Sequence, residues 1–168
     1  MAVLEKIEFA KLGPCRFIGK SVYAPPGSGE IYGALWGNSE AVFEAIGQLS
    51  KYATDEVHNV ALMTWDRYTE ADPIMGYTVG KFMKADTPVP DGLDYIDLPE
   101  AHIAKGWVKG EFDDMIASAE PLTSEAAKQN DKYTLTWQFM AEVYTDETIP
   151  EEGVSSVMGY YIACKANE

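Results

Sequence analysis

A short pattern of residues occurs twice in this chain. Residues 66–70 (Asp-Arg-Tyr-Thr-Glu) precede Met75-Gly76-Tyr77, and residues 142–146 (Glu-Val-Tyr-Thr-Asp) precede Met158-Gly159-Tyr160. In each copy, a loop joins an acid, a Tyr-Thr pair and a second acid to the Met-Gly-Tyr start of a strand. A repeated strand–turn–strand ending predicts two halves that are built alike and related by a pseudo-twofold axis. We expect the functional site where these halves meet.

The first half of the chain is predicted to have the order β-α-β-β. Residues 5–12 and 16–23 are short apolar segments that contain β-branched residues and are separated by Gly-Pro, which is typical of strands. Between residues 30 and 52, apolar residues recur mostly every three or four positions, which predicts an amphipathic helix. A break after Gly37 and a second start at Asn38-Ser39 are expected within it. The last two strands are predicted over 59–68 and 74–83.

The second half is predicted to repeat this order. A strand is expected over residues 101–109 and a helix over 110–130, with acidic residues at its positive N-terminal end. Strands are then expected over 134–144 and 157–165, joined by the acidic loop 145–153. The predicted order is therefore β-α-β-β in both halves.

The two repeats are predicted to form one domain. Residues 85–92 are rich in proline and turn-forming residues and are predicted to connect the repeats, which span about 1–84 and 93–168. Neither repeat is expected to bury a core alone, so we predict a single domain over residues 1–168. Its class is α+β: duplicated β-α-β-β units that form a mainly antiparallel sheet with helices packed on it.

The composition argues against several classes of protein. The chain has 27 acidic and 13 basic residues and a formal charge of −14, which opposes direct nucleic-acid binding because that needs Lys and Arg on phosphates. Cationic partners fit better, although a surplus of surface acids can also simply keep a protein soluble. No apolar run is long enough for a signal peptide or a membrane span, so we predict a cytoplasmic protein with no membrane contact. Cys15 and Cys164 belong to no paired motif and are predicted to be reduced, structural thiols.

Known cofactor and metal motifs are missing from the sequence. Gly27-Ser28-Gly29 lacks the Gly-Lys-Ser/Thr ending of a phosphate-binding loop, and no Gly-x-Ser-x-Gly nucleophile elbow occurs. His58 and His102 are far apart and lack the spacing of metal ligands. We therefore predict no cofactor and no metal.

Residues 138–144 alternate between two kinds of side chain, as the period of a strand requires. The odd-numbered residues are apolar and are expected to face the core, whereas Met140, Glu142 and Tyr144 share the other face. A thioether, a carboxylate and a phenol together suit a partly enclosed cleft better than open solvent. Asp66 and Tyr68 are expected at the equivalent places in the first copy. The alternative is that Glu142 and Asp66 are acids at strand ends, exposed to water.

Aromatic residues are numerous enough to form the walls of such a cleft. A well-placed ring attracts a cation by about 0.5–2 kcal/mol. Most aromatic residues in a domain belong to its core, so only a minority are expected to line a cleft. Trp36, Tyr68, Trp107 and Tyr144 are the predicted wall residues. Met140 would add an adaptable apolar surface for ligands of varied shape.

The order of elements and two short motifs resemble the GyrI-like small-molecule-binding domains, also described as the effector-binding domains of AraC- and MerR-type multidrug regulators. One motif is the strand-to-helix passage 104–112 (Ala-Lys-Gly-Trp-Val-Lys-Gly-Glu-Phe). The other is Ala141-Glu142-Val143-Tyr144, which is similar to the family's Phe-Glu-x-Tyr pattern, with Ala141 in place of the usual aromatic residue. The resemblance covers nearly the whole chain. It implies that Glu142 matches the acid that, in drug-sensing members, meets the charge of a lipophilic cation in an aromatic-walled pocket.

Three functions follow from the resemblance and the residues. The first is a stand-alone domain that binds amphipathic, cationic small molecules in sensing or sequestration, since the chain has no room for the separate DNA-binding region of the family's regulators. The second is hydrolysis of strained or electrophilic compounds, as in some stand-alone members, with Glu142 as general base and Tyr144 or Tyr68 holding the substrate. The third is a protein-interaction role, as in the gyrase inhibitor of this family, with the acidic residues 145–152 on a basic partner. Non-enzymatic binding is the first expectation.

Overall fold

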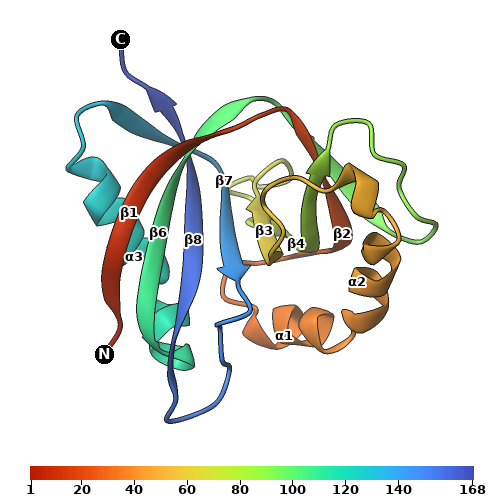
Figure 1. Cartoon of the computed structure of the whole chain (residues 1–168), viewed down its shortest axis with the longest axis horizontal. Helices are drawn as coiled ribbons and strands as arrows, with labels where there is room; N and C mark the ends of the chain where they lie inside the picture. Colours follow the sequence, from red (N-terminus) through yellow and green to blue (C-terminus); the bar gives the residue numbers. More distant parts are fainter. The chain divides into compact units, whose positions relative to one another are not determined.

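The computed structural model describes all residues from 1 to 168. It contains eight strands, three α-helices and one 3-10 turn (Figure 1), and its residues divide into two compact units. Residues 13–100 form the central unit, and residues 1–12 together with 101–168 form the terminal unit, named for the two chain ends that it contains. The strand pairings within both units are antiparallel, which confirms the predicted α+β class with a mainly antiparallel sheet. None of the helices has the length and apolar character needed to cross a membrane.

The central unit has four strands in the order β3-β4-β2-β5. Helix α2 packs against β2 and β4 through a buried cluster that includes Ile18, Val42, Ile46 and Met83. The cluster forms because the apolar residues of α2 recur at helical spacing and share one face. The elements are β2 (Cys15–Ala24), α1 (Gly29–Gly37), α2 (Glu40–Gly47), the 3-10 turn (Ser50–Tyr52), β3 (Asn59–Thr64), β4 (Met75–Lys84) and β5 (Asp94–Leu98).

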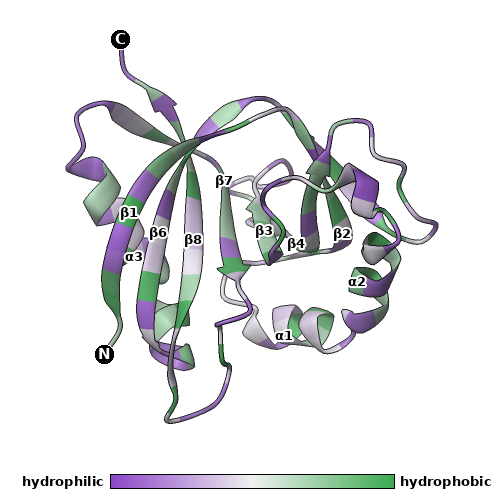
Figure 2. Ribbon diagram, in the orientation of Figure 1, coloured by the Kyte–Doolittle hydropathy of each residue, from purple (hydrophilic) through white to green (hydrophobic).

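The terminal unit also has four strands, in the order β1-β6-β8-β7. Helix α3 packs on this sheet, and its Ala127 joins Ala104 and Cys164 in a buried cluster. Figure 2 shows strand β1 alternating between hydrophilic and hydrophobic residues along its length, as expected for a strand at a sheet edge with one wetter face. The elements are β1 (Val3–Leu12), β6 (Ala101–Glu111), α3 (Phe112–Lys128), β7 (Tyr133–Tyr144) and β8 (Ser155–Ala166).

The two units share one topology, although their bounds differ from the predicted repeats 1–84 and 93–168, because β1 pairs with β6. In chain order, the central unit reads β2, α1 and α2, β3, β4, and the terminal unit reads β6, α3, β7, β8. In the central unit the last strand, β4, lies between β2 and β3, and in the terminal unit the last strand, β8, lies between β6 and β7. Strand β4 therefore corresponds to β8, and β2 corresponds to β6. Each sheet gains one further strand at the edge next to β2 or β6. This strand is β5 in the central unit and β1 in the terminal unit.

The repeated Met-Gly-Tyr segment has a structural role in both units. A side chain on Gly76 would place its Cβ 3.1 Å from Cε1 of the Tyr23 ring, and a side chain on Gly159 would place its Cβ 2.9 Å from Cζ3 of Trp107. Tyr23 and Trp107 occupy corresponding strands, β2 and β6. A side chain is therefore disfavoured at the same point of both sheets, because an aromatic ring of the neighbouring strand lies across each glycine and, at Gly76, the hydroxyl of Thr64 is closer still.

The break that the sequence predicts between α1 and α2 is present, but its hydrogen bonding differs from a standard helix cap. Ser39 precedes α2, yet its side chain makes no capping bond to that helix. Its hydroxyl instead donates to the carbonyl oxygen of Trp36 at 2.6 Å. The serine hydroxyl thus adds a second hydrogen bond to a carbonyl at the end of α1 that also accepts the Ser39 amide at 3.1 Å, which is another common use of a short polar side chain at a helix boundary.

Strand β5 is not predicted by the sequence analysis, because it is short and carries three charged or exposed residues. Contacts with Arg16 of β2 account for the formation of this strand. The Arg16 guanidinium donates to both carboxylate oxygens of Asp97, from Nε at 2.7 Å and from Nη2 at 3.1 Å. The same guanidinium lies 4.4 Å from the centre of the Tyr95 ring. A two-point ion pair and a stacked ring therefore tie β5 to β2.

Replacing Asp97 by asparagine should remove an acid-sensitive attachment of β5. The hydrogen bonds from Arg16 hold the pKa of Asp97 below its ordinary value of 3.8. A carboxyl group whose pKa is depressed by folding stabilises the fold at higher pH, and this contribution is lost as the pH falls through the folded-state pKa. We therefore expect the protection of the β5 amides, measured against the intrinsic exchange rate at each pH, to fall in the wild type below that ordinary value and to be low already near neutrality in Asp97→Asn. Exchange followed by NMR tests this, with the exposed Asp55→Asn as control; unchanged β5 protection in Asp97→Asn would contradict it.

Candidate functional site

Glu142 lies near the end of strand β7 and is half-buried. The hydroxyl of Tyr144, two residues along the same strand, donates a hydrogen bond to Glu142 Oε1 at 3.2 Å. Side chains two apart on a strand share a face, so the sequence spacing alone brings this carboxylate and this phenol together. The odd-numbered residues of the segment, Phe139, Ala141 and Val143, are buried, as the alternation predicts.

Strand pairing adds a second tyrosine to this face. Glu142 lies directly opposite Tyr160 of β8 in the antiparallel register. Tyr160 is only 5% exposed, and its hydroxyl donates to Met140 Sδ at 3.4 Å. The ring of Phe112, the first residue of α3, lies 6.1 Å from the Tyr144 ring. We call Phe112, Met140, Glu142, Tyr144 and Tyr160 the Glu142 cluster.

Helix α3 covers the sheet on the side of the Glu142 cluster. Gly106 of β6 lies opposite Tyr160, and a side chain at Gly106 would strike Thr123 of α3. Burial raises the pKa of Tyr160 far above its ordinary value of 10.0, and the negative charges of Glu142 and then Glu120 raise it further. Tyr160 therefore keeps its proton at physiological pH and remains a hydrogen-bond donor.

The cluster combines a carboxylate with three aromatic rings and a thioether. Such a group can attract a cation by charge and through the faces of the rings. Ser, Cys or His nucleophiles are not among the five residues, so the cluster is suited to binding or to general acid–base chemistry through Glu142.

Trp107 lies on the opposite face of the terminal sheet. It pairs with Gly159, whereas Glu142 pairs with the next residue, Tyr160, and neighbouring residues of a strand point to opposite faces. The indole N–H of Trp107 donates to Glu8 Oε1 at 2.7 Å, and its ring meets Tyr161 edge to face. The structure thus does not bring Trp107 into the Glu142 cluster.

Trp36 belongs to an aromatic group of the central unit. Its indole N–H donates to the hydroxyl of Tyr77 at 2.9 Å. The Tyr77 ring stacks on Tyr32 with ring centres 4.3 Å apart. Tyr77 is the last residue of the first Met-Gly-Tyr segment, as Tyr160 is of the second, so both copies of this tyrosine lie among polar and aromatic groups.

Asp66 and Tyr68 do not occupy places equivalent to those of Glu142 and Tyr144, and this prediction is wrong. Strand β3 ends at Thr64, so both residues lie in the following turn, and Tyr68 is 43% exposed. In the register, Thr64 pairs with Gly76. Val143 pairs with the corresponding Gly159. The residue of the central unit that corresponds to Glu142 is therefore Met63.

The reason for this correction is loop length. The loop between Thr64 and Gly76 is shorter than the loop between Val143 and Gly159. The repeated acid–Tyr–Thr–acid residues therefore lie on different parts of the two hairpins. In the first copy the acid–Tyr–Thr–acid segment forms the turn itself. In the second copy it begins inside β7.

Two members of the cluster, Phe112 and Tyr160, were not predicted as site residues. Phe112 falls within the helix expected over residues 110–130, which gave no reason to select it. Tyr160 was recognised as part of the repeat but not chosen for the site. A signal for Tyr160 did exist, because the repeated Met-Gly-Tyr follows each acidic pattern, and the two strands of a hairpin lie side by side.

Comparison with known proteins rests on structure. No family model and no curated protein sequence matches this chain. The structure of SAV2435 bound to tetraphenylphosphonium is similar over 95% of this chain and 94% of that one, with a TM-score of 0.69 and 12% sequence identity. The EcmrR C-terminal domain matches over 95% of this chain and 97% of its own length, with a TM-score of 0.53 and 14% identity. An integron cassette protein from Vibrio cholerae covers 98% and 99%, with a TM-score of 0.53 and 12% identity.

These likenesses establish the fold. The chain has the GyrI-like fold that its motifs and order of elements predict, shared with SAV2435 and with the C-terminal domain of EcmrR over nearly its full length.

Proposed function

We propose that this chain binds amphipathic, cationic small molecules and that the Glu142 cluster receives the positive charge. The observation that carries the proposal is the half-buried Glu142 carboxylate, hydrogen-bonded to Tyr144 and held against Tyr160. Its fold neighbour SAV2435 has been solved bound to tetraphenylphosphonium, a lipophilic cation, which supports the same class of ligand here. Sensing and sequestration both fit this role.

A carboxylate that is removed from bulk water loses part of its hydration, which costs free energy. That cost is several kcal/mol for a fully buried ion, and it falls when an opposite charge or hydrogen bonds compensate it. The phenol of Tyr144 supplies one hydrogen bond to this carboxylate. A bulky cation would supply the charge without demanding the tight geometry of a hydrogen bond, while the rings of Phe112 and Tyr144 and the thioether of Met140 would meet its apolar surface.

The net charge of −14 supports the same ligand class. A protein with a strongly negative field concentrates small cations near its surface and speeds their association at low ionic strength. The contribution to affinity itself is local, so binding should depend on Glu142 far more than on the many exposed acids.

Replacing Glu142 by glutamine should weaken the binding of tetraphenylphosphonium by about tenfold or more, which corresponds to about 1.4 kcal/mol. Glutamine keeps the size and one acceptor oxygen of glutamate and removes only the charge. Titration calorimetry on wild type and variant measures the change. The matched control is Glu152→Gln, which removes the same charge from an exposed loop position and should change affinity less than about twofold. Equal affinities of wild type and Glu142→Gln would refute the assignment of the site.

A second function, hydrolysis of electrophilic compounds, is favoured by one specific observation. The Tyr144 hydroxyl lies 3.2 Å from the carboxylate that would act as general base, so a donor and a base are adjacent. The two functions differ in the fate of the ligand. Mass analysis after incubation separates them, because a bound cation is recovered unchanged, whereas a hydrolysed compound gains the mass of water with wild type and not with Glu142→Gln.

A further inference from the structure

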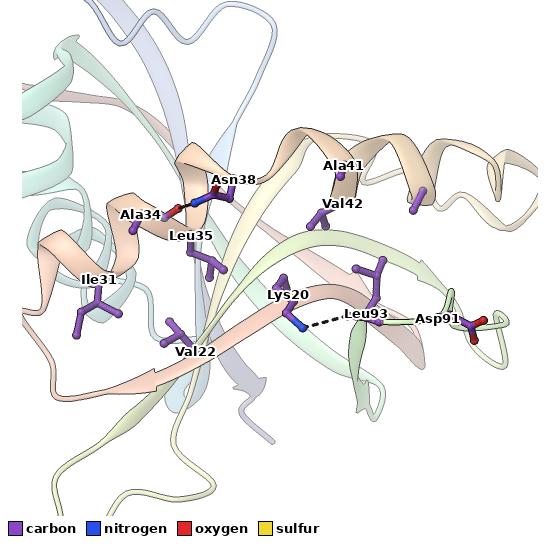
Figure 3. Close-up of a pocket in the computed structure, with 12 residues that line it drawn as sticks. Lys20, Val22, Ile31, Ala34, Leu35, Asn38, Ala41, Val42, Asp91 and Leu93 are labelled. Carbon is purple, nitrogen blue, oxygen red and sulfur yellow. Dashed lines mark hydrogen bonds between the residues drawn. The ribbon is translucent and has the colours of Figure 1, made fainter.

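The central unit contains a cavity that the Glu142 cluster does not explain. It has a volume of about 580 Å³ and lies between helices α1 and α2 on one side and strand β2 with the loop around Leu93 on the other (Figure 3). Figure 3 shows Leu35 and Val42 projecting from the helices toward β2, and Val22 and Leu93 projecting from the opposite side. This volume lies within the range of about 300–1,000 Å³ that is typical of small-molecule sites.

The walls of this cavity are apolar and only partly covered. Helix α1 has no buried residue, and Ile31, which lines the cavity, is 45% exposed. Covering apolar side chains on a concave surface of this size with an apolar group is favourable, because it removes water from them. The cavity is therefore suited to the hydrocarbon part of a ligand.

The edge of strand β2 leaves the cavity accessible. Strand β5 pairs with β2 only from Cys15 to Gly19, whereas β2 continues to Ala24. Beyond Gly19, therefore, β2 has β4 on one side and no strand on the other. Lys20 is the first residue of this open edge, and its ammonium group donates to the Gly92 carbonyl at 3.0 Å, at the rim of the cavity (Figure 3).

A second, polar groove of about 520 Å³ adjoins the cavity, because Lys20 and Leu93 line both. Its other cation is Arg67, whose guanidinium carbon lies 3.8 Å from the centre of the Tyr23 ring. Neither Lys20 nor Arg67 forms an ion pair in the structure. The groove also contains Asp94, whose carboxylate accepts the Ser21 amide at 2.9 Å.

Two basic side chains, Lys20 and Arg67, thus line one groove of a chain that has 27 acidic and only 13 basic residues. Arg67 is one of only two arginines in the chain, and the other, Arg16, is engaged by Asp97. Stacking on Tyr23 orients the Arg67 guanidinium and leaves its N–H donors available, which is an arrangement suited to a carboxylate.

We propose that this cavity and groove form a second small-molecule site, with specificity for amphipathic carboxylates. The hydrocarbon part would lie between α1, α2 and β2, and the carboxylate would face Lys20 and Arg67. The site belongs to the central unit alone and selects a ligand charge opposite to that proposed for the Glu142 cluster. One chain would therefore accept amphiphiles of either sign at separate places.

Three probes with the same ten-carbon chain test this proposal: decanoate, decanol and decyltrimethylammonium, each added below its micelle concentration to ¹⁵N-labelled protein. Decanoate is expected to shift the amides around Val22, Leu35, Val42 and Leu93, and to bind about fivefold or more tightly than decanol at this site. Equal affinity of decanol and decanoate, shifts confined to other residues, or no binding of decanoate would each overturn the proposal.

Variants distinguish the contribution of the Lys20 charge to decanoate binding from that of the apolar wall of the cavity. Lys20→Gln should weaken decanoate binding by about fivefold and leave decanol unchanged, whereas Lys20→Arg, which keeps the charge, should retain the preference. Lys132→Gln, an exposed change in the terminal unit, is the matched control and should have no effect. Ala41→Trp, from an exposed residue that lines the cavity, should block both decanoate and decanol while far-UV circular dichroism stays unchanged. Loss of binding in Lys132→Gln equal to that in Lys20→Gln would refute a specific role for Lys20.

Discussion

Replacing Gly106 by alanine should lower the free energy of unfolding by about 3 kcal/mol. The new Cβ would overlap the Thr123 hydroxyl and lie 2.8 Å from both Cβ and Cγ2 of Thr123. Both residues are buried, and Thr123 is fixed in α3, so neither the strand nor the helix can move without disturbing the packing of α3 on β6. The methyl group therefore has no free space to occupy.

Urea unfolding followed by circular dichroism measures this change. Two further variants test whether the loss of stability comes from the clash with Thr123. Gly33→Ala lies in α1 with no atom within 4 Å of the added methyl group, so it should be neutral or stabilising by up to about 1 kcal/mol. Adding Thr123→Ala to Gly106→Ala removes two of the three clashing atoms, so the double variant should be destabilised by less than the sum of the single changes. Strict additivity would show that α3 does not pack on Gly106 as described.

Replacing Ile18 by alanine should also lower the free energy of unfolding, again by about 3 kcal/mol. Ile18 is 0% exposed and packs with Val42, Ile46 and Met83, the cluster that joins α2 to the central sheet. Truncation removes three carbon atoms from this cluster and leaves a cavity that the strand cannot close, because β2 is held by β4 on one side and β5 on the other.

The graded variant Ile18→Val is the internal control. It removes a single methyl group and should cost about 1 kcal/mol. Urea unfolding of the two variants side by side tests whether the loss scales with the carbon removed. If Ile18→Ala lowered the free energy of unfolding no more than Ile18→Val does, α2 would not depend on this cluster for its position.

Most of the elements could be predicted from local patterns. The strands around residues 59–64, 75–84 and 155–166 have alternating or continuous apolar residues bounded by turn residues, and the break between α1 and α2 falls at the predicted glycine. β5 could not be predicted in this way. Its five residues are held by contacts with Arg16, which lies far away in sequence, and no local pattern reports such a contact.

The same distinction between local pattern and distant contact applies to the residues of the candidate site. That Glu142 and Tyr144 share a face follows from the two-residue period of any strand, so the sequence was sufficient to pair them. That Tyr160 lies opposite Glu142, and that Trp107 lies on the other face, depends on the register between strands. A shift of one residue in that register would exchange the two faces.

Local chemistry in the chain thus decided the duplicated order of elements and the carboxylate–phenol pair, because each depends on backbone periodicity. The tertiary structure alone decided which acid of the duplicated pattern enters a strand, which aromatic rings surround Glu142, and that Lys20 and Arg67 face one groove. The physical reason is that these features depend on strand register and hairpin loop length, which are set by the packing of residues distant in sequence and not by the neighbours of any one residue.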